Sequence, residues 1–187
     1  MCFGLTEPNA GSDASMISTK AVRDGDGWNI SGRKIWTSNA PIADYCVVFA
    51  RTEEGISAFM VPTTAEGFEI QRVIKLFGHI GGDEAEISME NVYVEPWQLV
   101  GELGKGFAAA LYGVSLGRIY NSARSVGYGR WALEMAIDYS STREAFGSAI
   151  SDYQGVSFPI AESATELHAA HLICLLYTSD AADEQDR

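Results

Sequence analysis

Short apolar segments separated by turn residues fill the first hundred positions of the chain. Each segment is bounded by Gly, Pro, Asn or Asp, and they lie at 15–23, 28–31, 34–38, 44–51, 56–61, 68–73, 85–90 and 92–94. The run Asp24-Gly25-Asp26-Gly27 between the first two is typical of a hairpin turn. Short strands at close spacing, with no helical segment between them, predict an antiparallel β-barrel or sandwich.

The pattern changes to a helical period after Pro96. From Gly106 to about Thr142, apolar, small and a few polar residues recur at helical spacing: Phe107, Leu111, Val114, Arg118, Ser122, Ser125, Gly129, Leu133 and Ala136. A second helical segment runs from about Ser151 to Leu176, and Pro159 inside it predicts a kink or a later helix start. Small residues in the middle of the first stripe would let a neighbouring helix approach closely.

These patterns predict an α+β chain in three parts. A β-domain covers 1–100, and the first helices of a C-terminal helical bundle cover 101–176. Two helices cannot enclose a core by themselves, so further helices or another subunit must complete the bundle. The tail at 177–187 has no apolar stripe to bury, and we expect it to be disordered or non-native.

Composition narrows the classes of function. The 187 residues include 13 Lys and Arg against 25 Asp and Glu, a formal charge of −12, so a general nucleic-acid or anionic-membrane surface is not expected. The longest apolar stretches, 46–50 and 169–177, are shorter than the roughly 20 residues of a membrane span. With no visible targeting segment, we expect a soluble, cytoplasmic protein, or a mitochondrial matrix protein in a eukaryote. The cysteines Cys2, Cys46 and Cys174 indicate neither a disulfide framework nor a zinc site.

The first candidate site is the segment Thr6-Glu7-Pro8-Asn9-Ala10-Gly11-Ser12-Asp13. Pro, Asn and Gly favour a turn, and backbone N–H groups there, together with the hydroxyls of Thr6 and Ser12, could meet a phosphate or a carbonyl. The alternative is an ordinary polar loop.

The second candidate is Lys34-Ile35-Trp36-Thr37-Ser38-Asn39. Side chains alternate along a strand, so Trp36 and Ser38 should share one face. A flat ligand could stack on the indole while Ser38 reaches its edge. The alternative is that Trp36 packs in the core of the barrel.

Two arginines follow on the helices. Arg118 lies in register with Leu111 and Val114, where a guanidinium needs an anionic or carbonyl partner. Arg143 lies 25 positions on, about 37 Å away along a straight helix, so one small ligand cannot use both. Ion pairs within or between helices are the alternative for each. His168 and His171 lack further ligands at recognised spacing, which favours packing over metal binding.

Together these motifs resemble the acyl-CoA dehydrogenase family over about residues 2–161. The motifs that carry the resemblance are Gly4-Leu5-Thr6-Glu7-Pro8 with Gly11-Ser12-Asp13, Trp36-Thr37-Ser38-Asn39, Val100-Gly101 to Gly106-Phe107, Arg143 with Phe146-Gly147, and Gln154. The opening motif is most similar to the glutaryl-CoA dehydrogenase branch. The resemblance implies FAD as cofactor, an acyl-CoA substrate, an electron-transfer flavoprotein or similar acceptor, and a homo-oligomeric parent protein, either a tetramer or a dimer.

The resemblance also implies a set of binding residues. It places Thr6 near the pyrimidine edge of the flavin and Ser38 near N5, and it assigns Arg143, Phe146 and Gln154 to the FAD of a neighbouring subunit. The full implied set is Phe3, Thr6, Gly11, Ser12, Trp36, Ser38, Arg143, Phe146 and Gln154 for FAD, with Ser12 and Arg118 for acyl-CoA.

The reaction that the resemblance implies needs a carboxylate base. The base removes the α-proton of the thioester while hydride leaves the β-carbon for the flavin. Some family members carry this Glu where the present chain has Gly117, so no catalytic base is expected here, and we expect it in a later segment. The chain is therefore predicted to be a fragment of a flavin-dependent enzyme that oxidises acyl-CoA to 2-enoyl-CoA. We expect the fragment to have no activity alone. A flavin oxidase or monooxygenase of the same superfamily, and a non-catalytic binding module, are the alternatives.

Overall fold

The computed structural model describes residues 1–78 and 81–185, with side chains up to Leu176. The chain divides into two compact units, Met1–Tyr112 and Gly113–Arg187. The helix α1 (Gly106–Thr142) begins in the first unit and continues into the second.

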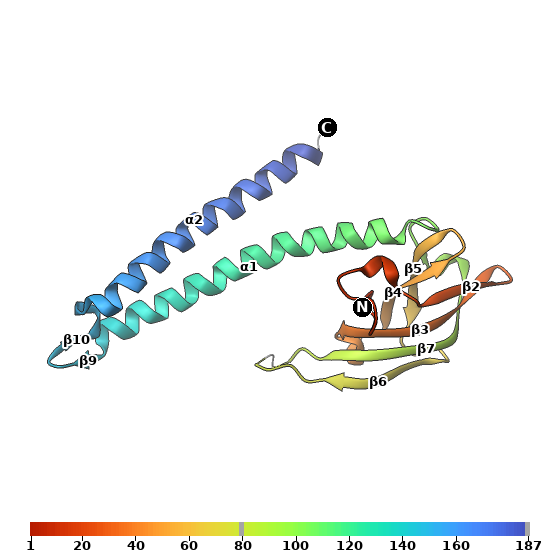
Figure 1. Cartoon of the computed structure of the whole chain (residues 1–187), viewed down its shortest axis with the longest axis horizontal. Coiled ribbons are helices and arrows are strands. Elements are labelled where there is room, and N and C mark those ends of the chain that lie inside the picture. The colour runs from red at the N-terminus through yellow and green to blue at the C-terminus, as the bar shows by residue number, and fades with distance from the viewer. Residues whose placement is uncertain (79–80, 186–187) are drawn as a thin grey trace. The chain divides into compact units, whose positions relative to one another are not determined.

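Within the described part of the first unit, eight strands form one mixed sheet (Figure 1). The strand order is β6-β7-β3-β2-β4-β5-β8, and β1 pairs with β4 off this path. Most pairings are antiparallel as expected, but β1–β4 and the short β2–β4 pairing are parallel. The α+β class is confirmed. The strands are β1 (Cys2–Gly4), β2 (Lys20–Asp24), β3 (Gly27–Ser38), β4 (Tyr45–Thr52), β5 (Gly55–Pro62), β6 (Phe68–Ile74), β7 (Glu84–Val94) and β8 (Leu99–Val100).

Irregular pairing explains where the expected strands differ from the observed ones. The segments 28–31 and 34–38 form the single strand β3, whose register against β7 shifts between Ile30 and Gly32 and again between Lys34 and Thr37. The extra residue lies in β7 at the first shift and in β3 at the second, and Gly32 between the two expected segments made one strand look like two in the sequence. The segments 85–90 and 92–94 likewise form the single strand β7. Strand β2 starts only at Lys20, because 14–16 form a short 3-10 helix.

The core of the first unit lies between the curved faces of this sheet. Trp28 and Phe59 are 3% and 0% exposed, and their ring centroids are 5.3 Å apart. A second cluster joins the sheet to the first turns of α1 through Ala110 and Phe107. The helix begins against β5 so closely that a Cβ on Gly106 would lie 2.6 Å from the backbone nitrogen of Ala58. Only glycine fits there.

The second unit is a helical hairpin. Helix α1 has the predicted bounds, and after it come β9 (Glu144–Ala145), β10 (Ser148–Ala149), a 3-10 turn and α2 (Gln154–Gln185). Helix α2 starts before Pro159 and includes it, so a later start is wrong. A Cβ on Gly129 would lie 2.4 Å from Cδ2 of Leu167, so the small residue does allow close approach of the two helices. The backbone of α2 is helical to Gln185.

Candidate functional site

The turn that follows β1 is tight. The backbone N–H of Glu7 donates to the carbonyl of Ala10 at 3.0 Å, and the N–H of Ala10 donates back to Glu7 at 3.1 Å. Pro8 and Asn9 therefore form the tip, as expected for their turn preference. Gly11 and Ser12 lie exposed on the outside, whereas the side chain of Glu7 is buried.

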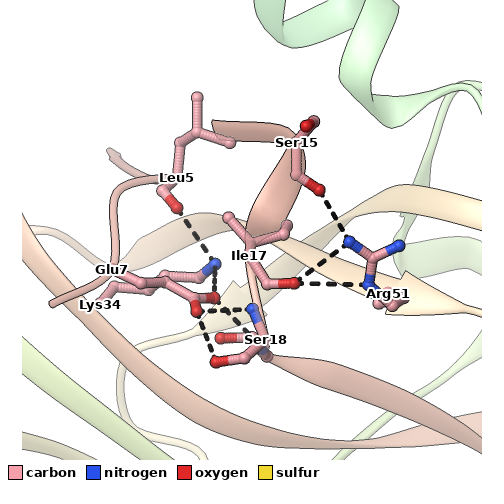
Figure 2. A network of polar contacts seen from close by, with 8 residues as sticks. Leu5, Glu7, Ser15, Ile17, Ser18, Lys34 and Arg51 are labelled. Atoms are coloured by element: carbon pink, nitrogen blue, oxygen red, sulfur yellow. Dashed lines mark hydrogen bonds and ion pairs between the residues drawn. The ribbon is translucent and has the colours of Figure 1, made fainter. Parts of the chain in front are cut away.

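A buried ion pair ties this turn to β3 (Figure 2). Lys34 Nζ lies 2.8 Å from Glu7 Oε1, and the two side chains are 0% and 3% exposed. Lys34 also donates to the carbonyl of Leu5 at 3.2 Å. The carboxylate of Glu7 accepts further hydrogen bonds from the backbone and hydroxyl of Ser18 and from the backbone N–H of Thr19. Every charged atom of the pair is thus supplied with partners, which a buried pair requires.

The pair is held in its ionised form. Burial by itself would raise the pKa of Glu7, but the hydrogen bonds from Lys34, Thr19 and Ser18 outweigh it and lower the pKa to about 2. Burial lowers the pKa of Lys34, and the neighbouring Glu7 carboxylate opposes that effect. A carboxylate with so low a pKa is a poor general base at neutral pH. Glu7 is therefore a structural group.

The segment 15–18 is fixed by the same network. The guanidinium of Arg51 donates to the carbonyl of Ser15 at 2.7 Å and to that of Ile17 at 3.3 Å (Figure 2). Neither this anchor nor the Glu7–Lys34 pair was foreseen from the sequence. One signal was present, since Lys34 lies an even number of positions from the core residues Trp28 and Ile30 on the same strand.

Trp36 lies on the surface beside this turn. The backbone N–H of Ile35 donates to the carbonyl of Thr6 at 2.9 Å, which brings Thr6 next to Trp36. Trp36 is 53% exposed, so it is not the core tryptophan, a role that Trp28 has instead. Ser38 is exposed as well while Thr37 between them is buried, so Trp36 and Ser38 do share a face.

The backbone of Trp36 is strained. Its φ is +60°, in the left-handed region that residues with a bulky side chain rarely adopt, and it lies in the bulge between Lys34 and Thr37. Strain of this kind costs about 1–3 kcal/mol and gathers at functional sites. An exposed indole on a strained bulge is therefore a candidate ligand-binding group.

Phe3 belongs to the same neighbourhood through β1. It is 44% exposed, and its ring centroid lies 4.9 Å from that of Phe49. The next residue, Gly4, packs on Lys34, because a Cβ there would lie 3.4 Å from Lys34 Cγ. The structure thus places Phe3 on β1, Thr6 in the turn that follows it and hydrogen-bonded to β3, and Trp36 and Ser38 at the end of β3. We call these four residues the aromatic–hydroxyl face.

The helical unit gathers a second group of expected residues at one end. Arg143 follows α1, and its carbonyl accepts a hydrogen bond from the N–H of Ile150 at 2.8 Å, which closes the β9–β10 hairpin. Phe146 is fully exposed at φ +53°, with its ring edge-on to Tyr153 at 6.4 Å. Gln154 is the first residue of α2. The three residues Arg143, Phe146 and Gln154 therefore lie at the turn between the helices.

Arg118 stands apart from that group on α1. It is exposed beside a cavity of about 450 Å³ that Val126, Arg130 and His171 also line. None of the ion pairs among residues 1–78 and 81–176 involves Arg118 or Arg143.

Other expected features concern metals, thiols and membranes. In the part of the chain that the structure describes, no cluster of three or more His, Cys, Asp or Glu could hold a metal ion. Cys2 and Cys46 are register partners on β1 and β4, and no disulfide joins them. Neither described helix is both long and apolar enough to cross a bilayer.

Comparison with known proteins agrees with this arrangement. Residues 2–92 match the acyl-CoA dehydrogenase middle domain, and residues 104–187 match the acyl-CoA dehydrogenase C-terminal domain. The chain belongs to the acyl-CoA dehydrogenase family. The two matches correspond to the β-domain and the start of the helical bundle expected from the sequence.

Individual members of the family show the extent of the likeness. The chain is 40% identical over 178 residues to the caffeyl-CoA reductase–Etf complex subunit CarC of Acetobacterium woodii, covering 92% of this chain and 47% of that protein. It is 36% identical over 177 residues to the human mitochondrial short-chain specific acyl-CoA dehydrogenase, covering 92% and 43%. The chain spans about half the length of the curated relatives it matches.

A solved structure gives the same result. The glutaryl-CoA dehydrogenase of Mycobacterium smegmatis in complex with FADH2 superposes with a TM-score of 0.87 at 32% identity, covering 92% of this chain and 45% of that one. The proteins similar to this chain therefore include a caffeyl-CoA reductase subunit and a short-chain acyl-CoA dehydrogenase as well as a glutaryl-CoA dehydrogenase, so the resemblance is not confined to the glutaryl branch.

Proposed function

We propose that the protein containing this chain is a flavin-dependent acyl-CoA dehydrogenase that oxidises acyl-CoA to 2-enoyl-CoA. The observation that carries the proposal is the aromatic–hydroxyl face, where a strained, exposed Trp36 adjoins the segment that binds the Thr6 carbonyl and shares its exposed face with Ser38. Membership of the family and the FADH2 complex of a relative support it.

The residues present fit a flavin. An isoalloxazine ring is flat and aromatic with polar atoms along its edges, so it suits an exposed indole flanked by hydroxyl groups. FAD would supply the acceptor for the hydride. In this proposal Phe3 and Trp36 contact the ring, Thr6 and Ser38 hydrogen-bond its edges, and Gly11 and Ser12 contact the phosphates of FAD or acyl-CoA.

The ion pair beneath the face has a positioning role in this proposal. Glu7 lies one residue after Thr6, and Lys34 lies two residues before Trp36, so their 2.8 Å contact fixes the turn against the bulge. Preorganised groups bind a ligand without the cost of ordering them first. Breaking the pair would loosen Thr6 and Trp36 together.

The helical unit would supply two further sets of contacts, one to acyl-CoA and one to FAD. Arg118, free of ion pairs among the described residues, would bind an anionic or carbonyl group of acyl-CoA. Arg143, Phe146 and Gln154 would reach the FAD of a neighbouring subunit in a homo-oligomer. The CarC relative is named for an Etf complex, which supports an electron-transfer flavoprotein as the acceptor.

The same relative favours a second candidate, reduction of a 2-enoyl-CoA. It is named a caffeyl-CoA reductase, and the same binding face would serve either direction. The two are separated by mixing flavin-loaded protein with an acyl-CoA and an oxidised dye, or with an enoyl-CoA and a reduced dye, and measuring which dye reacts.

The placement of the flavin has its own test. In the full-length protein, Trp36→Ala combined with Thr6→Val should lower the flavin retained after gel filtration, measured by absorbance. Trp97→Ala is the matched control, because Trp97 is 62% exposed but lies away from this face on a 3-10 helix. Unchanged flavin content in the double variant would contradict the proposed site.

A further inference from the structure

Ser38 has a carboxylate as its cross-strand partner. It lies opposite Glu84 in the antiparallel pairing of β3 and β7. Its hydroxyl donates to the carboxylate, with Oγ 2.8 Å from one oxygen and 2.9 Å from the other. Beside this pair, the backbone N–H of Asn39 donates to the carbonyl of Asp83 at 2.8 Å. The backbone itself therefore holds Ser38 and Glu84 face to face.

This contact decides what the hydroxyl can offer a ligand. A serine hydroxyl has one hydrogen and two lone pairs, and an ionised carboxylate can only accept. The hydrogen of Ser38 is committed to Glu84, and a charge-assisted hydrogen bond of this kind is stronger than a neutral one. Towards a ligand, Ser38 therefore presents an acceptor and no donor.

The two redox states of a flavin differ in this respect at N5. Oxidised flavin has a bare ring nitrogen there, which can only accept a hydrogen bond, whereas reduced flavin carries an N–H. We propose that Glu84 orients the Ser38 hydroxyl as an acceptor, and that the pair thereby favours reduced over oxidised flavin. The inference rests on the proposed function, in which a flavin lies on the aromatic–hydroxyl face, with its N5 at Ser38 as the family resemblance implies. Glu84 is a positioning residue, since it acts through Ser38.

Charge must be separated from orientation in the test. The Glu84 carboxylate also places a negative charge near the ligand, and removing it changes the potential for that reason alone. Glu84→Gln removes the charge but keeps an oxygen that can accept the Ser38 hydrogen. Glu84→Ala removes both, and frees the hydroxyl to donate. The difference between these two variants therefore reports orientation.

The experiment measures the midpoint potential of the flavin bound to the full-length protein. The Glu84→Ala variant should prefer reduced over oxidised flavin about tenfold less than the Glu84→Gln variant does. A tenfold change corresponds to the free energy of about one hydrogen bond. For a two-electron couple this is about 30 mV. In a Ser38→Ala background, the two Glu84 variants should have equal potentials.

Asp83→Asn is the charge-matched control. Asp83 is the neighbour of Glu84, and among the residues that the structure describes its carboxylate pairs with Lys75 at 2.7 Å and not with Ser38. Its substitution should shift the potential equally whether residue 38 is Ser or Ala. Both Glu84 variants alter a side chain near the surface, and thermal unfolding checks that they remain folded.

Each outcome bears on the inference. Equal potentials for Glu84→Gln and Glu84→Ala with Ser38 present, and flavin fully bound, would overturn the role of Glu84 while leaving the proposed function intact. Unchanged flavin content in the Trp36→Ala, Thr6→Val variant would instead remove the proposed site, and this inference with it.

Discussion

The two units of this chain bury their apolar side chains to very different degrees. The first unit encloses a continuous core around Trp28, Phe59 and Ile87. In the second unit, as far as its side chains are described, Val126 is the one hydrophobic residue that falls below a tenth exposed, while Trp131, Tyr128 and Leu172 are more than half exposed. Both helices are apolar on several sides. A sheet that folds over itself completes its own core, whereas a pair of such helices needs further partners.

The exposed apolar surface of the second unit should affect catalysis more than any other property. We expect the 187-residue chain to show no dehydrogenase activity with FAD and acyl-CoA, because the family resemblance puts Gly117 at one base position and the other base position in a later segment. General-base catalysis alone is commonly worth about 10²- to 10⁴-fold. The measurement is dye reduction by acyl-CoA, compared with the same protein extended to the length of its relatives. Steady turnover by the chain alone would show that one of its carboxylates is the base.

Large-to-small substitutions should separate the units in stability. Phe59→Ala removes a fully buried ring and should cost about 3–5 kcal/mol of the free energy of unfolding. Trp131→Ala removes a larger side chain that is 62% exposed, and should change it by no more than about 0.5 kcal/mol. Urea unfolding followed by circular dichroism measures both. A large effect of Trp131→Ala would mean that the second unit already has its partner.

The buried ion pair gives a contrast within the first unit. Lys34→Met leaves the Glu7 carboxylate buried without its partner, which should cost about 3–5 kcal/mol. Adding Glu7→Gln should restore part of that loss, since no unpaired charge then remains. Lys105→Met, which breaks the exposed pair with Glu102, should leave the urea midpoint unchanged. Equal effects at Lys34 and Lys105 would contradict the buried geometry.

Acid should weaken the first unit through Glu7. Its pKa is about 2 in the folded protein, below its ordinary 4.5, so its stabilising contribution is fully present above about pH 4.5 and is lost as pH falls through about 2. The difference corresponds to about 3 kcal/mol. Glu7→Gln should be less stable at pH 6 and show a shallower loss between pH 5 and pH 2. Parallel curves for the two proteins would exclude this assignment.

Local patterns predicted the local features of the fold. The bounds of α1 and the hairpin turn at 24–27 follow from neighbouring residues, and both were foreseen. Strand β1 was missed, because Cys2-Phe3-Gly4 is too short to show alternation and its partner is β4, far along the chain. The bulge at Trp36 was missed for a similar reason, since it is defined against β7.

The candidate site likewise has features that the sequence predicts and features that only the fold shows. The shared face of Trp36 and Ser38 follows from the alternation of one strand, and the sequence predicted it. The partners of these residues do not follow, because Glu7–Lys34 and Ser38–Glu84 join segments 27 and 46 residues apart. A sequence pattern shows which side chains are present, but only the folded sheet shows which of them meet.

The pairing of β1 with β4 also sets an order of events during synthesis. Cys2 and its register partner Cys46 are 44 positions apart, so β1 leaves the ribosome well before the strand it needs. At about 5–20 residues per second, the delay is roughly 2–9 s. Glu7 likewise precedes Lys34 by 27 positions, or roughly 1–5 s at the same rate, and water must solvate its carboxylate until the lysine is made. The turn that carries Thr6 therefore acquires its final shape only after the middle of the sheet has been made.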